Sequence, residues 1–141
     1  MSKHWVIDAS PLIFLVKISQ TRLFAHLCDT LVIPNGVAQE VRDGDEDDPA
    51  RLWLQSEGTQ WIKDVKPVDP VIAAWDLGVG ESEVLSWCYH NPGYEAIIDD
   101  GTARKCALAM GIPVALLTKG TVRDARGFTS ITLIVSYIIA N

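Results

Sequence analysis

Hydrophobic runs along the chain are short, and turn-forming residues separate them into alternating predicted strands and helices. The run over 4–8 is typical of a buried strand, and Ser10 and Pro11 suit the start of a helix. A second run over 30–33 is followed by a predicted helix over 35–42. Alternation of this kind is typical of an α/β domain with a parallel sheet.

The same pattern continues through most of the chain. Further helices are predicted over 20–28, 49–57, 81–89 and 102–110, and further strands over 61–65, 95–98 and 112–117. Charged residues and glycine over 43–48 predict a loop. The apolar run over 131–140 is shorter than the roughly 20 residues needed to cross a bilayer, so we predict core or interface there. The expected fold is a three-layer α/β/α sandwich with a mainly parallel central sheet.

Carboxylates occur where these apolar segments begin or end. Asp8 and the pair Asp99 and Asp100 follow predicted strands, and Glu40 and Glu81 lie on predicted helices. Parallel strands end at one edge of a sheet, where ligands bind. An isolated ionised carboxylate costs several kcal/mol to bury, whereas a hard divalent cation binds several at once. The pattern predicts a Mg²⁺ or Mn²⁺ site suited to phosphodiester hydrolysis.

Length and composition predict a single domain over 1–141. With 48% hydrophobic residues, the chain of 141 residues can bury a core of its own. No signal peptide or membrane-spanning segment is recognised, so a cytoplasmic protein is expected. Cys28, Cys88 and Cys106 are too widely spaced for a zinc motif and are predicted to be reduced core residues. The three histidines show no ligand spacing.

Net charge argues against nucleic-acid binding until its distribution is considered. The chain carries −6 at pH 7, whereas binding to phosphates normally requires Lys and Arg. Acidic residues are concentrated over 40–48, while 101–126 hold an excess of Lys and Arg. This asymmetry allows a basic face beside an acidic metal site.

Four motifs in this order resemble the PIN-domain ribonucleases, particularly the VapC toxins of toxin–antitoxin pairs. They read VIDASPLIFL, IPNGVAQEV, GESEVL and AIIDDGTARKCALAMGI. The resemblance implies a metal-dependent endonuclease for single-stranded RNA and possible control by an antitoxin. Homodimerisation is a separate expectation, based on the apolar run over 131–139 and the five tryptophans. The resemblance weakens after residue 113, where the family's usual Gly-Thr turn is shifted or lost. The catalytic set that it implies is Asp8, Glu40, Glu81 and Asp100, of which Asp8, Glu81 and Asp100 are the expected metal ligands.

Three further residues are predicted to support this set. Ser10 is expected to support Asp8, and Asp99 to cap the helix after it or to hold water near the metal. Arg104 lies one helical turn beyond Asp100, so it could reach that carboxylate or a substrate phosphate. By contrast, Glu83 is predicted to face solvent.

Each acidic residue also has a purely structural interpretation. Asp8 could cap the helix that follows it, and Glu40 could be a solvated helix residue. Glu81 stabilises a helix N-terminus whatever else it does. At the level of function, two alternatives stay open. One is a non-catalytic PIN-like module that binds protein or RNA, and the other is phosphoryl transfer through Asp8 as a covalent nucleophile.

Overall fold

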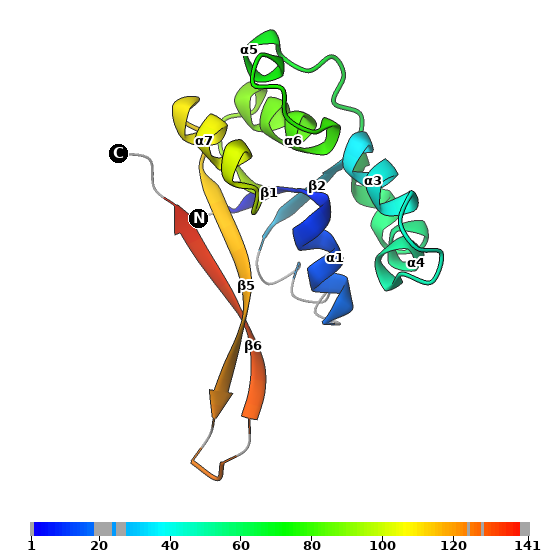
Figure 1. Cartoon of the computed structure of the whole chain (residues 1–141), viewed down its shortest axis with the longest axis vertical. Helices are drawn as coiled ribbons and strands as arrows, with labels where there is room; N and C mark the ends of the chain where they lie inside the picture. Colours follow the sequence, from blue (N-terminus) through cyan, green and yellow to red (C-terminus); the bar gives the residue numbers. More distant parts are fainter. Residues whose placement is uncertain (1, 19–23, 25–27, 124, 128, 139–141) are drawn as a thin grey trace.

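A six-stranded sheet with strand order β3-β2-β1-β4-β5-β6 forms the centre of the molecule (Figure 1). The computed structural model describes residues 2–18, 24, 28–123, 125–127 and 129–138. The first five strands in this order are parallel, and β6 is antiparallel to β5. The strands are β1 (His4–Ile7), β2 (Thr30–Pro34), β3 (Ile62–Lys63), β4 (Tyr94–Ile97), β5 (Val114–Arg123) and β6 (Thr129–Ile138).

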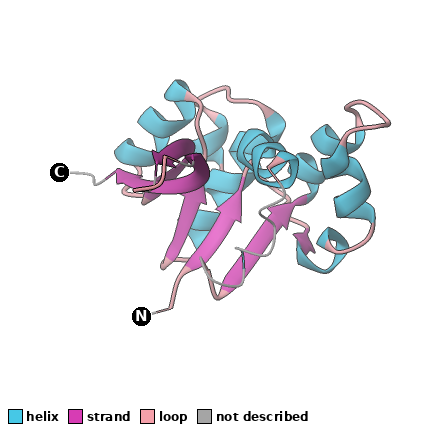
Figure 2. Cartoon of the chain, turned by 90° about the horizontal axis from the view of Figure 1, so that it is seen from below, coloured by secondary structure: helices cyan, strands magenta, loops and turns pink. Residues whose placement is uncertain are grey.

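Helices in the described segments form two groups, and Figure 2 shows them packed against the strands. One group consists of α1 (Ala9–Lys17), α3 (Asn35–Arg42) and α4 (Pro49–Gln55), followed by the 3₁₀ turn η2 (Gly58–Trp61). The other consists of α5 (Pro70–Ala73), α6 (Val79–His90) and α7 (Gly101–Ala109). Strands β2 and β3 lie on one side of β1, and β4 and β5 lie on its other side. Right-handed crossovers therefore place the two groups on opposite faces. The expected three-layer sandwich is confirmed.

Several predicted elements agree with the structure and others differ. The helix predicted over 35–42 is α3, and the helices predicted after Pro49 and around Glu81 are α4 and α6. Most of the helix predicted over 20–28 lies outside the described residues. The strand expected over 61–65 is reduced to the two residues of β3. Helix α5 and strand β6 were not predicted, and β5 extends well beyond residue 117.

The core explains why the ends of β1 and β4 are well fixed. Trp5, Val6 and Ile7 are fully buried, as are Ala96 and Ile97 on the adjacent strand. The strand order has a topological switch point between β1 and β4. In open α/β sheets, ligands bind at such a point. Asp8 directly follows β1, while Asp99 and Asp100 follow β4 and Ile98. The fold thus brings these predicted site residues to one edge of the sheet.

The cysteines and the helices can also be compared with the predictions made from the sequence. Cys28, Cys88 and Cys106 are buried and free, so their prediction as reduced core residues is confirmed. None of the described helices has the length and apolar character needed to cross a membrane.

Candidate metal centre at the strand ends

Asp8 is the most deeply buried of the acidic residues predicted for the site. Its backbone N–H donates to the carbonyl of Ile97 at 3.0 Å, which ties the end of β1 to the end of β4. The residue is 4% exposed, and its Oδ1 atom is buried with no hydrogen-bond partner. Asp8 holds the N-cap position of α1, yet its side chain makes no capping hydrogen bond. The structure therefore does not support the capping interpretation, and Oδ1 is left free for a ligand.

Glu40 reaches this place from α3. Its Oε1 accepts a hydrogen bond from the backbone N–H of Gly80, the second residue of α6, at 3.0 Å. A Cβ atom at Gly80 would lie 2.6 Å from Glu40 Oε1 and 3.2 Å from Asp8 Oδ1. Both carboxylates therefore lie against the same glycine. Although Glu40 is largely exposed, it is a member of the acidic cluster.

Glu81 and Asp100 extend the cluster through the N-termini of two helices. Glu81 Oε2 accepts from the backbone N–H of Gly78 at 3.0 Å, so this side chain closes the first turn of α6. Asp100 Oδ2 accepts from the N–H of Ala103 at 2.9 Å and caps α7. The alternative role predicted for Asp99 as the cap of this helix is thus wrong, because Asp100 fills that position. Asp99 is exposed at the rim of the cluster.

Neighbouring carboxylates act on the titration of Asp8 and Glu81. Burial raises the pKa of Asp8 from 3.8 to about 7; the Ala9 N–H opposes this, and the charges of Glu81, Glu40 and Asp99 add to it. Burial also raises the pKa of Glu81. The Gly78 N–H opposes that shift, and Asp100, Glu40 and Asp99 add to it. Buried carboxylates whose pKa is raised further by neighbouring negative charges make a site that favours a bound cation. Asp8 and Glu81 therefore lie close enough to the other carboxylates to be affected by their charges, and the role of this set at a metal site stays a prediction.

The cluster is not arranged as a finished coordination sphere. In the segments that the structure describes, no three carboxylate, imidazole or thiol groups are placed to hold one metal ion together. Glu40, Glu81 and Asp100 each direct one oxygen to a backbone N–H. The donors are nevertheless of the type that Mg²⁺ and Mn²⁺ prefer, and the unpartnered Asp8 Oδ1 is a free ligand atom among them. Small side-chain rotations would have to accompany metal binding.

The structure does not confirm contacts for two predicted supporting residues. Ser10 is exposed, and no hydrogen bond between its described side chain and Asp8 is found. For Arg104, the described contacts include a backbone hydrogen bond to the Asp100 carbonyl at 3.0 Å but no ion pair with its carboxylate. Arg104 lies on the first turns of α7, four residues after Asp100.

Sequence reasoning missed two residues next to the cluster. Glu83 was predicted to face solvent, and this is wrong, because it is 1% exposed and accepts from the backbone N–H of Gly36 at 3.2 Å. Gly80 lies in the GESEVL motif and was not predicted as a site residue, whereas it provides the space in which Glu40 and Asp8 meet. The spacing of two glycines before Glu81 was the available signal for close approach of other side chains.

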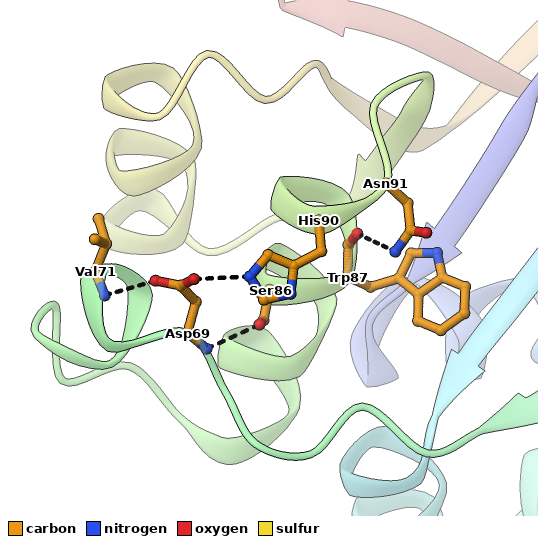
Figure 3. A network of polar contacts seen from close by, with 6 residues as sticks. All are labelled: Asp69, Val71, Ser86, Trp87, His90 and Asn91. Carbon is orange, nitrogen blue, oxygen red and sulfur yellow. Dashed lines mark hydrogen bonds and ion pairs between the residues drawn. The ribbon is translucent and has the colours of Figure 1, made fainter.

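A second polar cluster lies at the other end of α6 (Figure 3). His90 Nε2 lies 2.7 Å from Asp69 Oδ2, while the Asp69 N–H donates to Ser86 Oγ at 3.0 Å. The Asp69 carboxylate also accepts from the N–H of Val71 and caps α5. Because α6 has 12 residues, its two ends are roughly 16 Å apart. This cluster anchors the segment before α5 and supplies control positions away from the candidate metal centre.

Comparison with known proteins assigns the chain to a family. A family model described as a PIN domain matches residues 4–122. This chain belongs to the PIN-domain family. The solved structure of the PIN domain endonuclease Utp24 is similar to this PIN domain with a TM-score of 0.52. The two are 13% identical, and the match covers 82% of this chain and 85% of that chain. At this identity the likeness shows the shared fold. No match was found among curated proteins.

Gly80→Ala is expected to disrupt the candidate centre while the fold is kept. Alanine stabilises a helix by about 1 kcal/mol relative to glycine, and the Glu40 side chain is free to turn toward solvent. The new methyl group would displace Glu40 from Gly80 and crowd Asp8 Oδ1. We expect Mn²⁺ affinity to fall roughly tenfold or more, as when residues that support a metal site are changed, with little change in the urea midpoint. Unchanged Mn²⁺ affinity, measured by calorimetric titration, would contradict this prediction.

Proposed function

We propose that this PIN domain is a Mg²⁺- or Mn²⁺-dependent endoribonuclease that cleaves single-stranded RNA. The observation that supports it best is the gathering of Asp8, Glu40, Glu81 and Asp100 around the end of β1, with Asp8 Oδ1 buried and unpartnered. The family match and the similarity to a PIN domain endonuclease support a nuclease. The metal is our inference from the chemistry of the carboxylates, and the single-stranded RNA substrate is what the resemblance to the PIN-domain ribonucleases implies.

The side chains of the cluster would divide the work as follows. Asp8, Glu81 and Asp100 would hold the cation, and Glu40 would complete the catalytic set from α3. A bound Mg²⁺ or Mn²⁺ would activate a water molecule and stabilise charge on the phosphate. Without a cation, five carboxylates would repel the RNA backbone. Arg104 and the exposed Lys105, both on α7 beside Asp100, would attract the phosphates that flank the cleaved bond.

We further propose that a partner protein restrains this activity, as in a VapC-like toxin–antitoxin pair. Residues 43–47 form an exposed loop in which four of the five residues are acidic and none is basic. A basic segment of a partner would be attracted to this surface. Homodimerisation is a further proposal for the apolar segment over 131–140, whose residues favour an interface.

The function is tested by incubating the purified chain with a labelled single-stranded RNA. Cleavage in Mn²⁺ or Mg²⁺, and its absence in EDTA, is the expected result. A double-stranded RNA of the same sequence should be cut much more slowly. If the folded wild-type protein leaves the single strand intact over a range of Mn²⁺ concentrations and RNA sequences, the proposal is wrong.

A non-catalytic PIN-like module is the second candidate. It is favoured by one observation, namely that Glu40, Glu81 and Asp100 each bind a helix N-terminal N–H, so that each has a structural role already. Mn²⁺ titration separates the two candidates. A nuclease should bind Mn²⁺ through Asp8, whereas a scaffold should show no binding that depends on the carboxylates.

A further inference from the structure

Helices α3 and α6 are joined by two reciprocal hydrogen bonds. The N–H of Gly36, near the start of α3, donates to Glu83 Oε1 of α6 at 3.2 Å. The N–H of Gly80, near the start of α6, donates to Glu40 Oε1 of α3 at 3.0 Å. Each helix therefore supplies a glutamate to the N-terminus of the other, where a negative charge is stabilising. We name these four residues the α3–α6 clasp.

Both contacts of the clasp require glycine. A Cβ atom at Gly36 would overlap the Glu83 carboxylate and would lie 2.9 Å from Val79 Cγ1. A Cβ atom at Gly80 would lie 2.6 Å from Glu40 Oε1. With any other residue at these positions, each glutamate would be pushed away from the N–H that it now accepts. The two glycines therefore allow the helices to approach closely enough for both hydrogen bonds.

The two glutamates differ in their environment. Glu40 is exposed, whereas Glu83 is 1% exposed and its Oε2 is buried with no partner. Burying a carboxylate is costly unless it is compensated, and the Gly36 N–H at the start of α3 offsets part of this cost at Oε1. The N-cap residue of α3 is Pro34, which supplies no side-chain cap. Glu83 therefore takes the place of the missing cap and fixes the start of α3 on α6.

We propose that Glu83 is a positioning residue of the metal centre, which holds α3 against α6 so that Glu40 reaches Gly80 and the neighbourhood of Asp8. This inference rests on the function proposed above. Glu83 acts through α3, because its bound oxygen is directed to Gly36. The charges that act on Asp8 come from Glu81, Glu40 and Asp99, and Glu83 is not among them. Its role thus differs from that of the four residues proposed as catalytic.

Kinetic comparison of Glu83→Gln and Glu83→Ala tests the proposal in the full chain. Gln keeps a carbonyl oxygen for the Gly36 N–H and has nearly the same shape, so kcat for RNA should stay within about threefold of wild type. Ala removes the acceptor, so kcat should fall roughly 10- to 100-fold as Glu40 is misplaced, with little change in KM. Ser86→Ala is the matched control, because Ser86 is also 1% exposed on α6 but contacts Asp69.

Amide hydrogen exchange of Gly36 and Gly80 gives a readout that does not depend on activity. Glu83→Ala should speed exchange at both glycines, although only Gly36 contacts Glu83. Glu83→Gln and Ser86→Ala should leave both rates near wild type. Should Glu83→Ala fail to fold, Glu83→Asp replaces it, because the shorter side chain withdraws the carboxylate from Gly36 and is expected to show the same losses.

Three outcomes would overturn the proposal. The first is a folded Glu83→Ala protein with wild-type kcat, and the second is faster exchange at Gly36 alone. The third is Glu83→Gln being as inactive as Glu83→Ala, which would mean that the charge of Glu83 itself takes part in the site. If wild-type protein cleaves no RNA, the proposed function fails, while the exchange rates still decide whether the clasp positions Glu40.

Discussion

Asp8→Asn is expected to lower RNA cleavage by at least about 100-fold, because a metal ion supplies several kcal/mol of transition-state stabilisation and each 1.36 kcal/mol is a factor of ten. Asparagine has the size of aspartate but lacks the charge that holds a divalent cation. Asp8 Oδ1 is buried and makes no structural hydrogen bond, so the substitution removes charge from the centre without breaking such a bond. Initial rates of cleavage of a labelled single-stranded RNA in Mn²⁺ measure the effect.

A matched control separates lost chemistry from lost structure. Asp69→Asn alters an acidic residue at the opposite end of α6, so cleavage should stay near wild type. Circular dichroism and the urea midpoint should show that the Asp8→Asn protein is folded. Cleavage at the wild-type rate by folded Asp8→Asn would remove Asp8 from the site and with it the proposed mechanism.

In EDTA, the stability of the wild-type protein should fall by a few kcal/mol between pH 4 and pH 7 because of Asp8. Burial raises its folded-state pKa to about 7, whereas an unfolded aspartate titrates near 3.9. The stabilisation by protonated Asp8 is therefore fully present below about pH 4 and is lost as pH rises toward 7. The raised pKa of Glu81 acts in the same direction.

Asp8→Asn isolates this contribution, since asparagine does not titrate. In EDTA at pH 7.5 the variant should be more stable than wild type, and near pH 4 the two should be close. Saturating Mn²⁺ should narrow this difference at pH 7.5, because a ligand at 100 times its Kd stabilises the folded state by about 2.7 kcal/mol. Urea unfolding across this pH range is the measurement. A difference between the two proteins that does not change with pH would contradict the predicted burial of an ionisable Asp8.

Much of the central sheet was predictable because the local sequence pattern and the rules for parallel sheets favour the same structure there. The runs around β1 and β2 are apolar and are followed by residues that suit helix starts, so both the strands and the positions of their ends could be predicted. The placement of Asp8 and Asp100 followed from the rule that ligands bind beyond the carboxyl ends of parallel strands. Family resemblance was needed for Glu40, whose local sequence is equally typical of a solvated helix.

Other parts of the candidate site depend on contacts between distant segments. Glu83 and Gly36 are 47 residues apart, and nothing near Glu83 in the sequence indicates that a helix N-terminus will cover it. A glutamate in the first turns of a helix is usually solvated, so the prediction of exposure followed an ordinary rule that the α3–α6 packing overrides. The role of Gly80 was hidden for the same reason, because the residues that it accommodates come from β1 and α3.

Strand β6 was missed for a different reason. The run over 131–140 is apolar enough for a helix or a strand, and such short runs cannot be distinguished by periodicity alone. The partner that decides its conformation is the distal part of β5, where residues 118–123 are largely polar and give a weak strand signal. Pairing with β5 in register from Val114 with Ile138 to Arg123 with Thr129 makes the segment a strand.

The long β5–β6 ribbon leaves the body of the molecule (Figure 1), and this implies a graded opening of the fold. Strand β5 pairs with β4 through Val114 and Ala115, whereas it pairs with β6 along its whole length of ten residues. A two-stranded ribbon is only marginally stable in water. Amides at the far end of the ribbon should therefore exchange with solvent at a far lower free-energy cost than those of β1 and β4. The β5–β6 ribbon would thus open first at the end far from β4, while the acidic centre stays folded.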